Sequence, residues 1–468
     1  MNALRQLVQL CIDLQEEQPN KNLDRILSRL QGPLRVAIAG RINSGKSTLV
    51  NALLEQLVAP VDNRECTRVV TWYTFAPFPS AYLIRRDGTR HKLEFDREGR
   101  VPSDLAVDLD EVERIDVTLS NKALRDLTII DTPGLQTTSN DVARGAERVL
   151  GLDPSSTMAV KEADVTVYLM THLKEADVEL LRTHLGNVSP ATSLGVLSKA
   201  DRLAVGQGEQ LAATFAEELR ALLWDVVPVN GLAAETAQCG RLTETDASAM
   251  RRLHEQPEGD LRIQLLHAKR FVESGDRDER QRLLDLFDTT ALQRAVEQQV
   301  SGTAADYCDW LFGESGFDRL SNTIRTLFTE RSRVLKVASA VDDLKTLAFD
   351  SALTESQRER VVDELDILTK SDELHDVDEI ELLRDVRRGR IRAQDPKLLD
   401  QLERLLSPGD ALERLGLTLE PLATAADLAA QQAGQWRRLA NSGLEPISMR
   451  RAAEVAERSC NRLWEALR

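Results

Sequence analysis

Residues 34–54 read LRVAIAGRINSGKSTLVNALL, and this stretch decides the fold of the chain. Its apolar start, residues 34–39, predicts a buried strand, and the run from Thr48 onward predicts a helix. Between strand and helix lie the eight residues GRINSGKS, which match the pattern G-x-x-x-x-G-K-[S/T]. Glycines here let backbone N–H groups surround phosphate oxygens, and the helix N-terminus adds the positive end of its dipole. The stretch therefore predicts a nucleotide-phosphate site between a strand and a helix.

Two side chains of this loop suit phosphate chemistry. We expect Lys46 to neutralise the β- and γ-phosphates and the Ser47 hydroxyl to bind Mg²⁺. Both are therefore predicted to be catalytic as well as binding residues. The remaining predicted contacts to the nucleotide come from the same loop and the first turn of the helix, namely Gly40, Asn43, Ser44, Gly45 and Thr48.

A second motif, LTIIDTPG at residues 127–134, ends another apolar strand. Asp131 stands at the carboxyl end of that strand, where we expect its carboxylate to hold Mg²⁺ through a water molecule. Gly134 offers a flexible backbone N–H to the γ-phosphate. A D-x-P-G turn is common by itself, so this prediction depends on its position after the phosphate loop.

A third motif, SKAD at residues 198–201, again follows an apolar strand. Lys199 is expected to lie along the purine ring, and Asp201 to accept hydrogen bonds from the ring N–H and the exocyclic amine of guanine. Adenine offers no such pair of donors, so the motif predicts selection of GTP over ATP. Asn230 and Gly231 follow the next strand and are predicted to contact the base through their backbone.

The segment ECTRVVT, residues 65–71, lies between the first two motifs. A GTPase needs one hydroxyl here to complete the Mg²⁺ shell and to sense the γ-phosphate. We favour Thr67 over Thr71, because Val69 and Val70 already enter a strand. Thr67 is thus predicted to be a catalytic and metal-binding residue, and a solvated loop threonine is the alternative.

Hydrophobic patterning predicts the fold class. Short β-branched runs alternate with helical patterns up to about Pro228, which predicts a doubly wound, mostly parallel α/β sheet. Together with the three motifs, this predicts a P-loop GTPase domain. Polar alternation around residues 81–120 predicts an added antiparallel edge, and amphipathic helices follow from about residue 241. Three parts are expected: an N-terminal helix that packs with the helical bundle (1–32), a GTPase domain (33–312) and an all-α bundle forming a neck and trunk (313–468).

Composition excludes some partners. The chain has 468 residues and a formal net charge of −16, which disfavours sequence-independent nucleic-acid binding and simple electrostatic adhesion to anionic lipid. Its five cysteines are widely spaced, which favours a reducing compartment over a disulfide framework. No apolar run is long enough for a transmembrane helix. We therefore expect a cytoplasmic protein that does not bind nucleic acid.

The order of these motifs resembles that of the bacterial dynamin-like GTPases. Residues 43–72 and the stretch FGESGFDRLSNTIRTLFTERSRVLK (312–336) are particularly similar to the actinobacterial isoniazid-inducible dynamin-like proteins. Thr67 and Arg68 resemble the switch threonine and arginine of dynamins. The resemblance implies a GTPase head on a helical neck and trunk, and nucleotide-dependent association with itself or a related dynamin-like GTPase. It also implies peripheral action on lipid at the inner face of the plasma membrane.

The chain departs from this family in the phosphate loop. Dynamins usually place Gln-Ser where this chain has Ile42-Asn43, so their water-positioning glutamine is missing. Leu135 stands where Ras-like GTPases carry a catalytic glutamine, and Gln136 comes one position later. Slow hydrolysis is therefore expected unless another group positions the water. Asn43 matches the loop asparagine of potassium-stimulated GTPases, which makes K⁺ or Na⁺ a candidate cofactor, and Arg41 is the competing cation.

Lipid contact has to come from a surface segment, because no hydrophobic hairpin is present. Residues 384–397 hold six basic and two acidic side chains and are the best basic candidate, with ion pairing inside the protein as the alternative. Two other functions stay open at this point. One is a soluble regulatory GTPase whose helical half docks protein partners, and the other is a weakly hydrolysing structural subunit of a dynamin-like pair.

Overall fold

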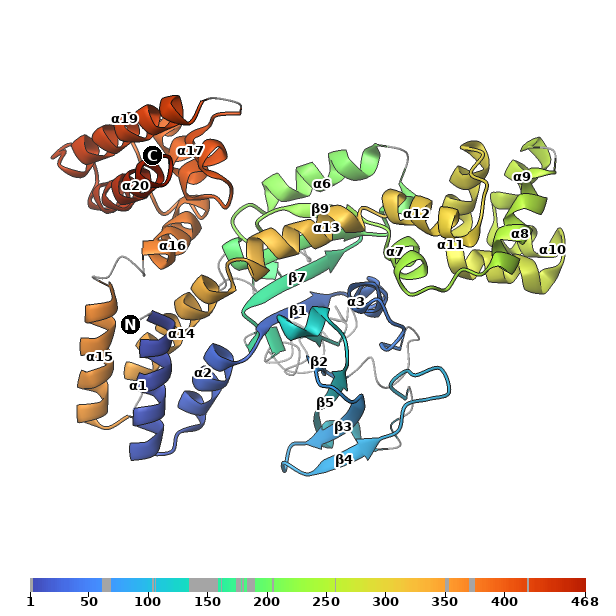
Figure 1. The fold of residues 1–468 in the computed structure, drawn as a ribbon, viewed down its shortest axis with the longest axis horizontal. Coiled ribbons are helices and arrows are strands. Elements are labelled where there is room, and N and C mark those ends of the chain that lie inside the picture. Colours follow the sequence, from blue (N-terminus) through green and yellow to red (C-terminus); the bar gives the residue numbers. More distant parts are fainter. Residues whose placement is uncertain are drawn as a thin grey trace, which may run out of the picture.

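The structure, a computed structural model, places a mixed sheet at the centre of several groups of helices (Figure 1). It describes residues 3–60, 69–102, 105, 107–133, 159–160, 162–173, 178, 181–182, 190–203, 206–256, 258–349, 353–369, 375–418 and 421–468. Within these residues the sheet has nine strands in the order β4-β3-β5-β2-β6-β1-β7-β8-β9. The strands are β1 (Leu34–Gly40), β2 (Thr71–Phe75), β3 (Ser80–Arg85), β4 (Arg90–Leu93), β5 (Val112–Leu119), β6 (Leu127–Asp131), β7 (Val165–Met170), β8 (Ser193–Ser198) and β9 (Val226–Val229).

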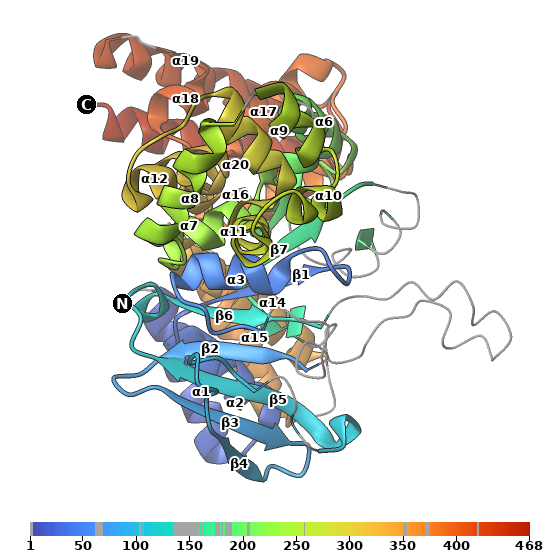
Figure 2. The same ribbon diagram turned by 90° about the vertical axis from the view of Figure 1, so that its right-hand side faces the viewer.

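Strand direction follows the sequence prediction. β6, β1, β7, β8 and β9 run parallel to one another. β2 runs antiparallel to β6 and parallel to β5. β3 runs antiparallel to both β4 and β5, which confirms the antiparallel edge expected around residues 81–120. Figure 2 shows this edge, β2 to β5, on the side of the sheet away from α7 to α12.

Helices cover both faces of the sheet. Along β1 the alternate residues Val36 and Ile38 belong to one hydrophobic cluster, and Ala37 and Ala39 belong to another. Helix α3 packs into the first cluster and α6 into the second, so the sheet is doubly wound as predicted. The helices are α1 (Ala3–Glu17), α2 (Lys21–Gln31), α3 (Lys46–Leu54), α6 (Gln207–Glu218), α7 (Gly231–Gln238), α8 (Glu244–His254), α9 (Glu258–Leu265), α10 (Ala268–Glu273), α11 (Arg277–Glu297), α12 (Ala304–Glu314), α13 (Phe317–Ile324), α14 (Ser332–Ala348), α15 (Glu355–Thr369), α16 (His375–Arg387), α17 (Pro396–Leu406), α18 (Ala411–Leu415), α19 (Leu422–Ala440) and α20 (Ile447–Ala466).

Three groups of helices surround the sheet in Figure 1. Helices α8 to α12 form an arm with its own hydrophobic cluster, and α16 to α20 form a second group that contains the buried Trp436. The third group consists of α1, α2, α14 and α15, whose apolar faces share one cluster. Within the described residues, no helix is long and apolar enough to span a membrane.

The N-terminal stretch forms two helices where the sequence predicted one. The break falls at Pro19-Asn20, because Asn20 caps α2 by accepting a hydrogen bond from the N–H of Asn22. α1 buries Leu7, Cys11 and other residues of its apolar stripe against the third group. Burial in this cluster raises the pKa of the Cys11 thiol to about 12.

A buried ion-pair network joins this third group to the sheet. Arg29 on α2 donates from Nη2 to Asp164 Oδ1 at 3.1 Å and from Nη1 to Asp343 Oδ2 on α14 at 2.8 Å. Asp164 directly precedes β7, and its Oδ2 accepts the backbone N–H of Arg35 on β1 at 2.8 Å. One guanidinium therefore connects the N-terminal helices, the sheet and α14.

Candidate nucleotide-binding site

The phosphate loop, residues 40–45, leaves β1 through a backbone that few side chains tolerate. Gly40 has φ 147°, and a Cβ there would lie 2.5 Å from the carbonyl oxygen of Leu169. Gly45 caps α3 with φ 90°, and Asn43 has the left-handed φ of 60°. Glycine is therefore required at residue 40, where β1 and β7 approach each other closely.

Lys46 lies buried at the first position of α3. Its Nζ donates to the carbonyl oxygens of Gly40 at 3.1 Å and Arg41 at 2.9 Å. Burial lowers the pKa of Lys46, and the nearby Asp131 carboxylate acts in the opposite direction. The ammonium is thus held over the loop, in the position from which it can neutralise a bound phosphate.

Ser47 and Asp131 form a pair of oxygen ligands next to this lysine. The Ser47 hydroxyl donates to Asp131 Oδ2 at 3.1 Å, and Oδ1 is buried with no hydrogen-bond partner among the described residues. Burial raises the pKa of Asp131 to about 6, although the charge of Lys46 and the hydrogen bond from Ser47 oppose the shift. A buried, unmatched carboxylate oxygen beside a hydroxyl fits a Mg²⁺ ion, which prefers hard oxygen ligands.

The base-recognition motif lies at the end of β8. Lys199 adopts the left-handed φ of 57° and leads into a short 3-10 helix, Ala200–Arg202, that carries the buried Asp201. Burial raises the pKa of Asp201, and the charge of Asp288 adds to that shift. Burial likewise lowers the pKa of Lys199.

Asn230 and Gly231 join this motif to the phosphate helix. Asn230 follows β9 and caps α7, where its Oδ1 accepts the N–H of Ala233 at 3.1 Å. A Cβ on Gly231 would lie 3.6 Å from Cγ2 of Thr48 on α3, so the loop packs closely on that helix. The segments expected to bind base and phosphate therefore touch.

Parallel strands explain why these residues gather. β1, β6, β8 and β9 end at the same edge of the sheet, and this edge carries Gly40, Asp131, Lys199 and Asn230. The side chain of Ser44 is buried, and its hydroxyl has no hydrogen-bond partner among the residues that the structure describes. The side chain of Thr48 is half-buried, and that of Asn43 is exposed.

Most of the predicted switch residues lie outside the part of the chain that the structure describes. Thr67 and Gly134 lie outside the described residues, as do Arg68, Leu135 and Gln136. Thr71, the alternative to Thr67, opens β2 and is buried opposite Asp131 in the antiparallel register.

Three residues near the site had no place in the motif predictions. Asp288 sits at a kink in α11 with φ 65°, and its only sequence signal is the poor helix propensity of Asp288-Thr289-Thr290. Asn51 and Glu235 are buried and hydrogen-bonded to each other at 2.7 Å. A single amide inside the apolar run of α3 was the available signal for Asn51.

The fold and the site together define a P-loop GTPase domain joined to a largely helical region. A profile of the Dynamin family matches residues 36–200. Isoniazid-induced protein IniC of Mycobacterium tuberculosis is 31% identical over 459 residues, which cover 93% of this chain and 91% of IniC. The chain therefore belongs to the dynamin family, among the bacterial dynamin-like relatives of the isoniazid-induced proteins.

Three further matches cover less of this chain or are less similar in sequence. Isoniazid-induced protein IniA of Mycobacterium tuberculosis is 34% identical over 128 residues, which cover 25% of this chain and 19% of IniA. A solved structure of an oligomerised bacterial dynamin pair aligns with 99% of this chain and 74% of its own, at 16% identity and a TM-score of 0.35. Era of Aquifex aeolicus, bound to GDP and AlF₄⁻, aligns with 43% of this chain and 52% of its own, at 18% identity and a TM-score of 0.25.

Proposed function

We propose that this chain binds GTP with Mg²⁺, hydrolyses it, and couples the cycle to association of GTPase domains and to membrane remodelling or maintenance. The observation that carries the proposal is the buried Oδ1 of Asp131, which lacks a hydrogen-bond partner within the described residues and lies beside Ser47 and Lys46. Such an arrangement favours the arrival of a cation together with a phosphate.

The chain's own residues have separate tasks in this proposal. Lys46 neutralises the phosphates, Ser47 and Asp131 hold the ion, and Asp201 with Lys199 recognises guanine. A bound Mg²⁺ supplies charge neutralisation at the transferred phosphate. The remaining proposed binding residues are Gly40, Asn43, Ser44, Gly45, Thr48, Gly134, Asn230 and Gly231, with Thr67 as the switch threonine.

Membrane contact is proposed for one tip of the helical half. Part of the basic segment 384–397 is engaged inside the protein, because Arg387 pairs with Glu403 at 2.9 Å and stacks on Trp224 at 4.0 Å. Arg392 and Lys397 remain exposed, and Gln394 in the same loop donates to the backbone oxygen of Leu444.

The turn between α19 and α20 adds apolar side chains to this tip. Leu444 is 83% exposed and Ile447 is 70% exposed. Two exposed apolar residues beside basic ones suit peripheral contact with anionic lipid. We therefore propose that lipid contact is made by this tip, which consists of residues 389–397 and 442–447.

Phosphate release and vesicle co-sedimentation test the proposed function. Phosphate release under multiple turnover, with Mg²⁺ and with Lys46→Ala as control, should show hydrolysis that the variant loses. Absence of hydrolysis in a wild-type chain that binds GTP would support the structural-subunit alternative instead.

Co-sedimentation with phosphatidylglycerol vesicles should fall for Leu444→Asp and stay low with phosphatidylcholine vesicles. No vesicle binding in any nucleotide state would favour a soluble regulatory GTPase.

A further inference from the structure

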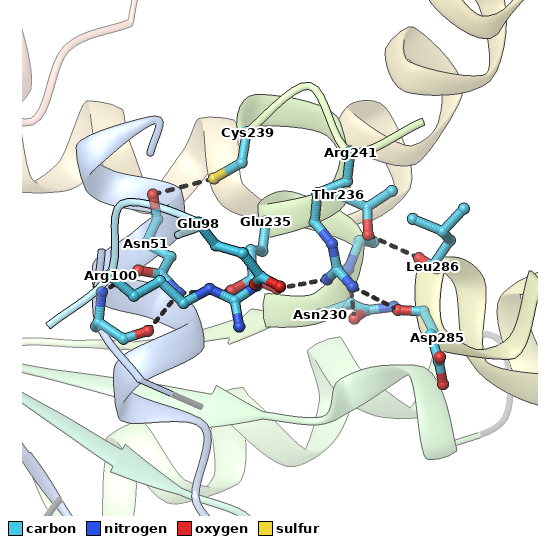
Figure 3. A network of polar contacts seen from close by, with 12 residues as sticks. Asn51, Glu98, Arg100, Asn230, Glu235, Thr236, Cys239, Arg241, Asp285 and Leu286 are labelled. Atoms are coloured by element: carbon cyan, nitrogen blue, oxygen red, sulfur yellow. Dashed lines mark hydrogen bonds and ion pairs between the residues drawn. The ribbon is translucent and has the colours of Figure 1, made fainter. Parts of the chain in front are cut away.

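A buried polar network links α3 to α7, the helix that begins directly after Asn230 in the segment Asn230-Gly231, here called the guanine loop. Its centre is Asn51, which is fully buried in the second turn of α3 (Figure 3). Asn51 Oδ1 accepts the N–H groups of Val58 at 3.0 Å and Ala59 at 2.7 Å, and its Nδ2 donates to the oxygen of Ala59 at 3.1 Å. The second Nδ2 hydrogen goes to Glu235 Oε1 at 2.7 Å.

All the hydrogen-bonding capacity of this amide is used. A primary amide has two donor hydrogens and two acceptor lone pairs, and all four are used by Asn51 in bonds to the adjacent residues Val58 and Ala59 and to Glu235 on α7. Neither an apolar residue nor a carboxylate of similar size could make this set of bonds. The network therefore depends on asparagine at this position.

Glu235 is the bridge from this helix to the guanine loop. It lies one turn after Asn230-Gly231 on α7 and is 2% exposed. Its second oxygen accepts Arg241 Nη1 at 2.6 Å, and Arg241 Nη2 reaches the backbone oxygen of Asp285 on α11 at 3.1 Å. Burial raises the pKa of Glu235, while Asn51 and Arg241 oppose that shift.

We infer that Asn51 and Glu235 are positioning residues that hold the guanine loop at a fixed distance from the phosphate loop. Both ends of a bound nucleotide would then rest on α3, which carries Lys46 and Ser47 at its start and Asn51 in its middle. The inference rests on the proposed binding of GTP. A displacement of α7 would move Asn230 and Gly231 away from the base and leave the phosphate contacts in place.

A comparison of Glu235→Ala with Glu235→Gln tests this bridge. The side-chain oxygen of glutamine can still accept the hydrogen bond from Asn51, whereas alanine has no acceptor. We expect Glu235→Ala to weaken GDP affinity about tenfold and to reduce the preference for GDP over ADP by a similar factor. The kcat at saturating GTP should stay within about threefold of wild type. Glu235→Gln should bind GDP nearly as wild type does.

Thr236→Val is the matched control. Thr236 is the next residue on α7, is fully buried, and donates to Leu286 on α11 at 2.8 Å instead of to α3. Its loss should lower the melting temperature and leave the preference for GDP over ADP unchanged. A Glu235→Ala variant with wild-type preference and only a lower melting temperature would overturn the inference.

A double variant covers the case in which Glu235→Ala fails to fold. Asn51→Asp faces Glu235 with a second carboxylate, and adding Glu235→Gln restores a donor across the same gap. The double variant should recover part of the GDP preference lost in Asn51→Asp, and no recovery would contradict a direct bridge. A wild-type chain with no preference for GDP over ADP would instead contradict the proposed function.

Discussion

Two buried carboxylates, one in each half of the molecule, have opposite electrostatic surroundings. Asp131 at the nucleotide site has an oxygen without a hydrogen-bond partner among the described residues, and burial raises its pKa to about 6. For Glu379 on α16, burial also acts to raise the pKa, yet hydrogen bonding with His375 and the charge of Arg414 lower it to about 2. Both carboxylates are buried, so the difference comes from their partners.

The partners of Glu379 converge on a single oxygen. Arg414 Nη2 and Ser459 Oγ each donate to Oε1 at 2.6 Å, and His375 Nε2 lies 3.4 Å away. This cluster connects α16, α18 and α20, and the charge of Glu379 is paired with Arg414 within the protein. Of the two oxygens of Asp131, only Oδ2 has a hydrogen-bond partner among the described residues. A buried carboxylate with an unpaired oxygen indicates a ligand site, whereas one that is fully hydrogen-bonded and ion-paired is typical of a structural cluster.

Asp131→Asn should have the largest effect on activity and the opposite effect on stability. Loss of the carboxylate removes an ion ligand, so GTP hydrolysis should fall at least about 100-fold. The ligand-free protein should become more stable by about 2 kcal/mol at pH 7.5, because a costly buried charge disappears. Phosphate release and urea unfolding in EDTA measure the two effects.

Asp126→Asn provides the control for this substitution. Asp126 is exposed and directly precedes β6, at the other end of the strand from Asp131. Neither hydrolysis nor stability should change measurably in this variant. An Asp131→Asn variant that is less stable than the wild type in EDTA would contradict the contrast with Glu379.

Glu379→Gln should destabilise the protein and leave the nucleotide site intact. The amide leaves the buried charge of Arg414 without its partner, which should cost about 3 kcal/mol. Asp376→Asn is the matched control on the same helix, since the ion pair of Asp376 with Arg462 is exposed and should contribute less than about 1 kcal/mol. Urea unfolding measures both, and a GDP affinity changed by Glu379→Gln would show that the cluster is not purely structural.

The sequence predicted the role of Asp131, which lies in a local motif, but not the cluster around Glu379. Asp131 ends an apolar strand in a short motif, and strand–helix alternation predicted a mostly parallel sheet with each motif at the end of a strand. Asn51 and Glu235 are 184 residues apart, and the Glu379 cluster joins three helices. Amphipathic patterns show which face of a helix is buried but not which helix covers it. Contacts between distant polar residues were therefore beyond prediction.

A smaller effect is expected from a monovalent cation bound at the nucleotide site. Asn43 is exposed on the phosphate loop with a left-handed backbone. It precedes Ser44, whose buried hydroxyl has no hydrogen-bond partner in the described part of the chain. If its carbonyl oxygen helps to hold K⁺, hydrolysis should be about tenfold faster in KCl than in NaCl, and Asn43→Ala should remove the difference. Equal rates in the two salts would exclude this role for Asn43.

The pH dependence of stability should differ in sign between the two carboxylates. The pKa of Asp131 in the folded protein lies above its usual value, so the native state takes up the proton first and acidification from pH 7 to pH 5 should stabilise the EDTA-treated protein by about 1 kcal/mol. The pKa of Glu379 lies below its usual value, so the unfolded state takes up the proton first and acidification from pH 6 to pH 4 should cost about 1 kcal/mol. Urea unfolding across this range should lose the first slope in Asp131→Asn and the second in Glu379→Gln. Loss of the same slope in both variants would mean that one coupled group, and not two independent ones, controls the acid response.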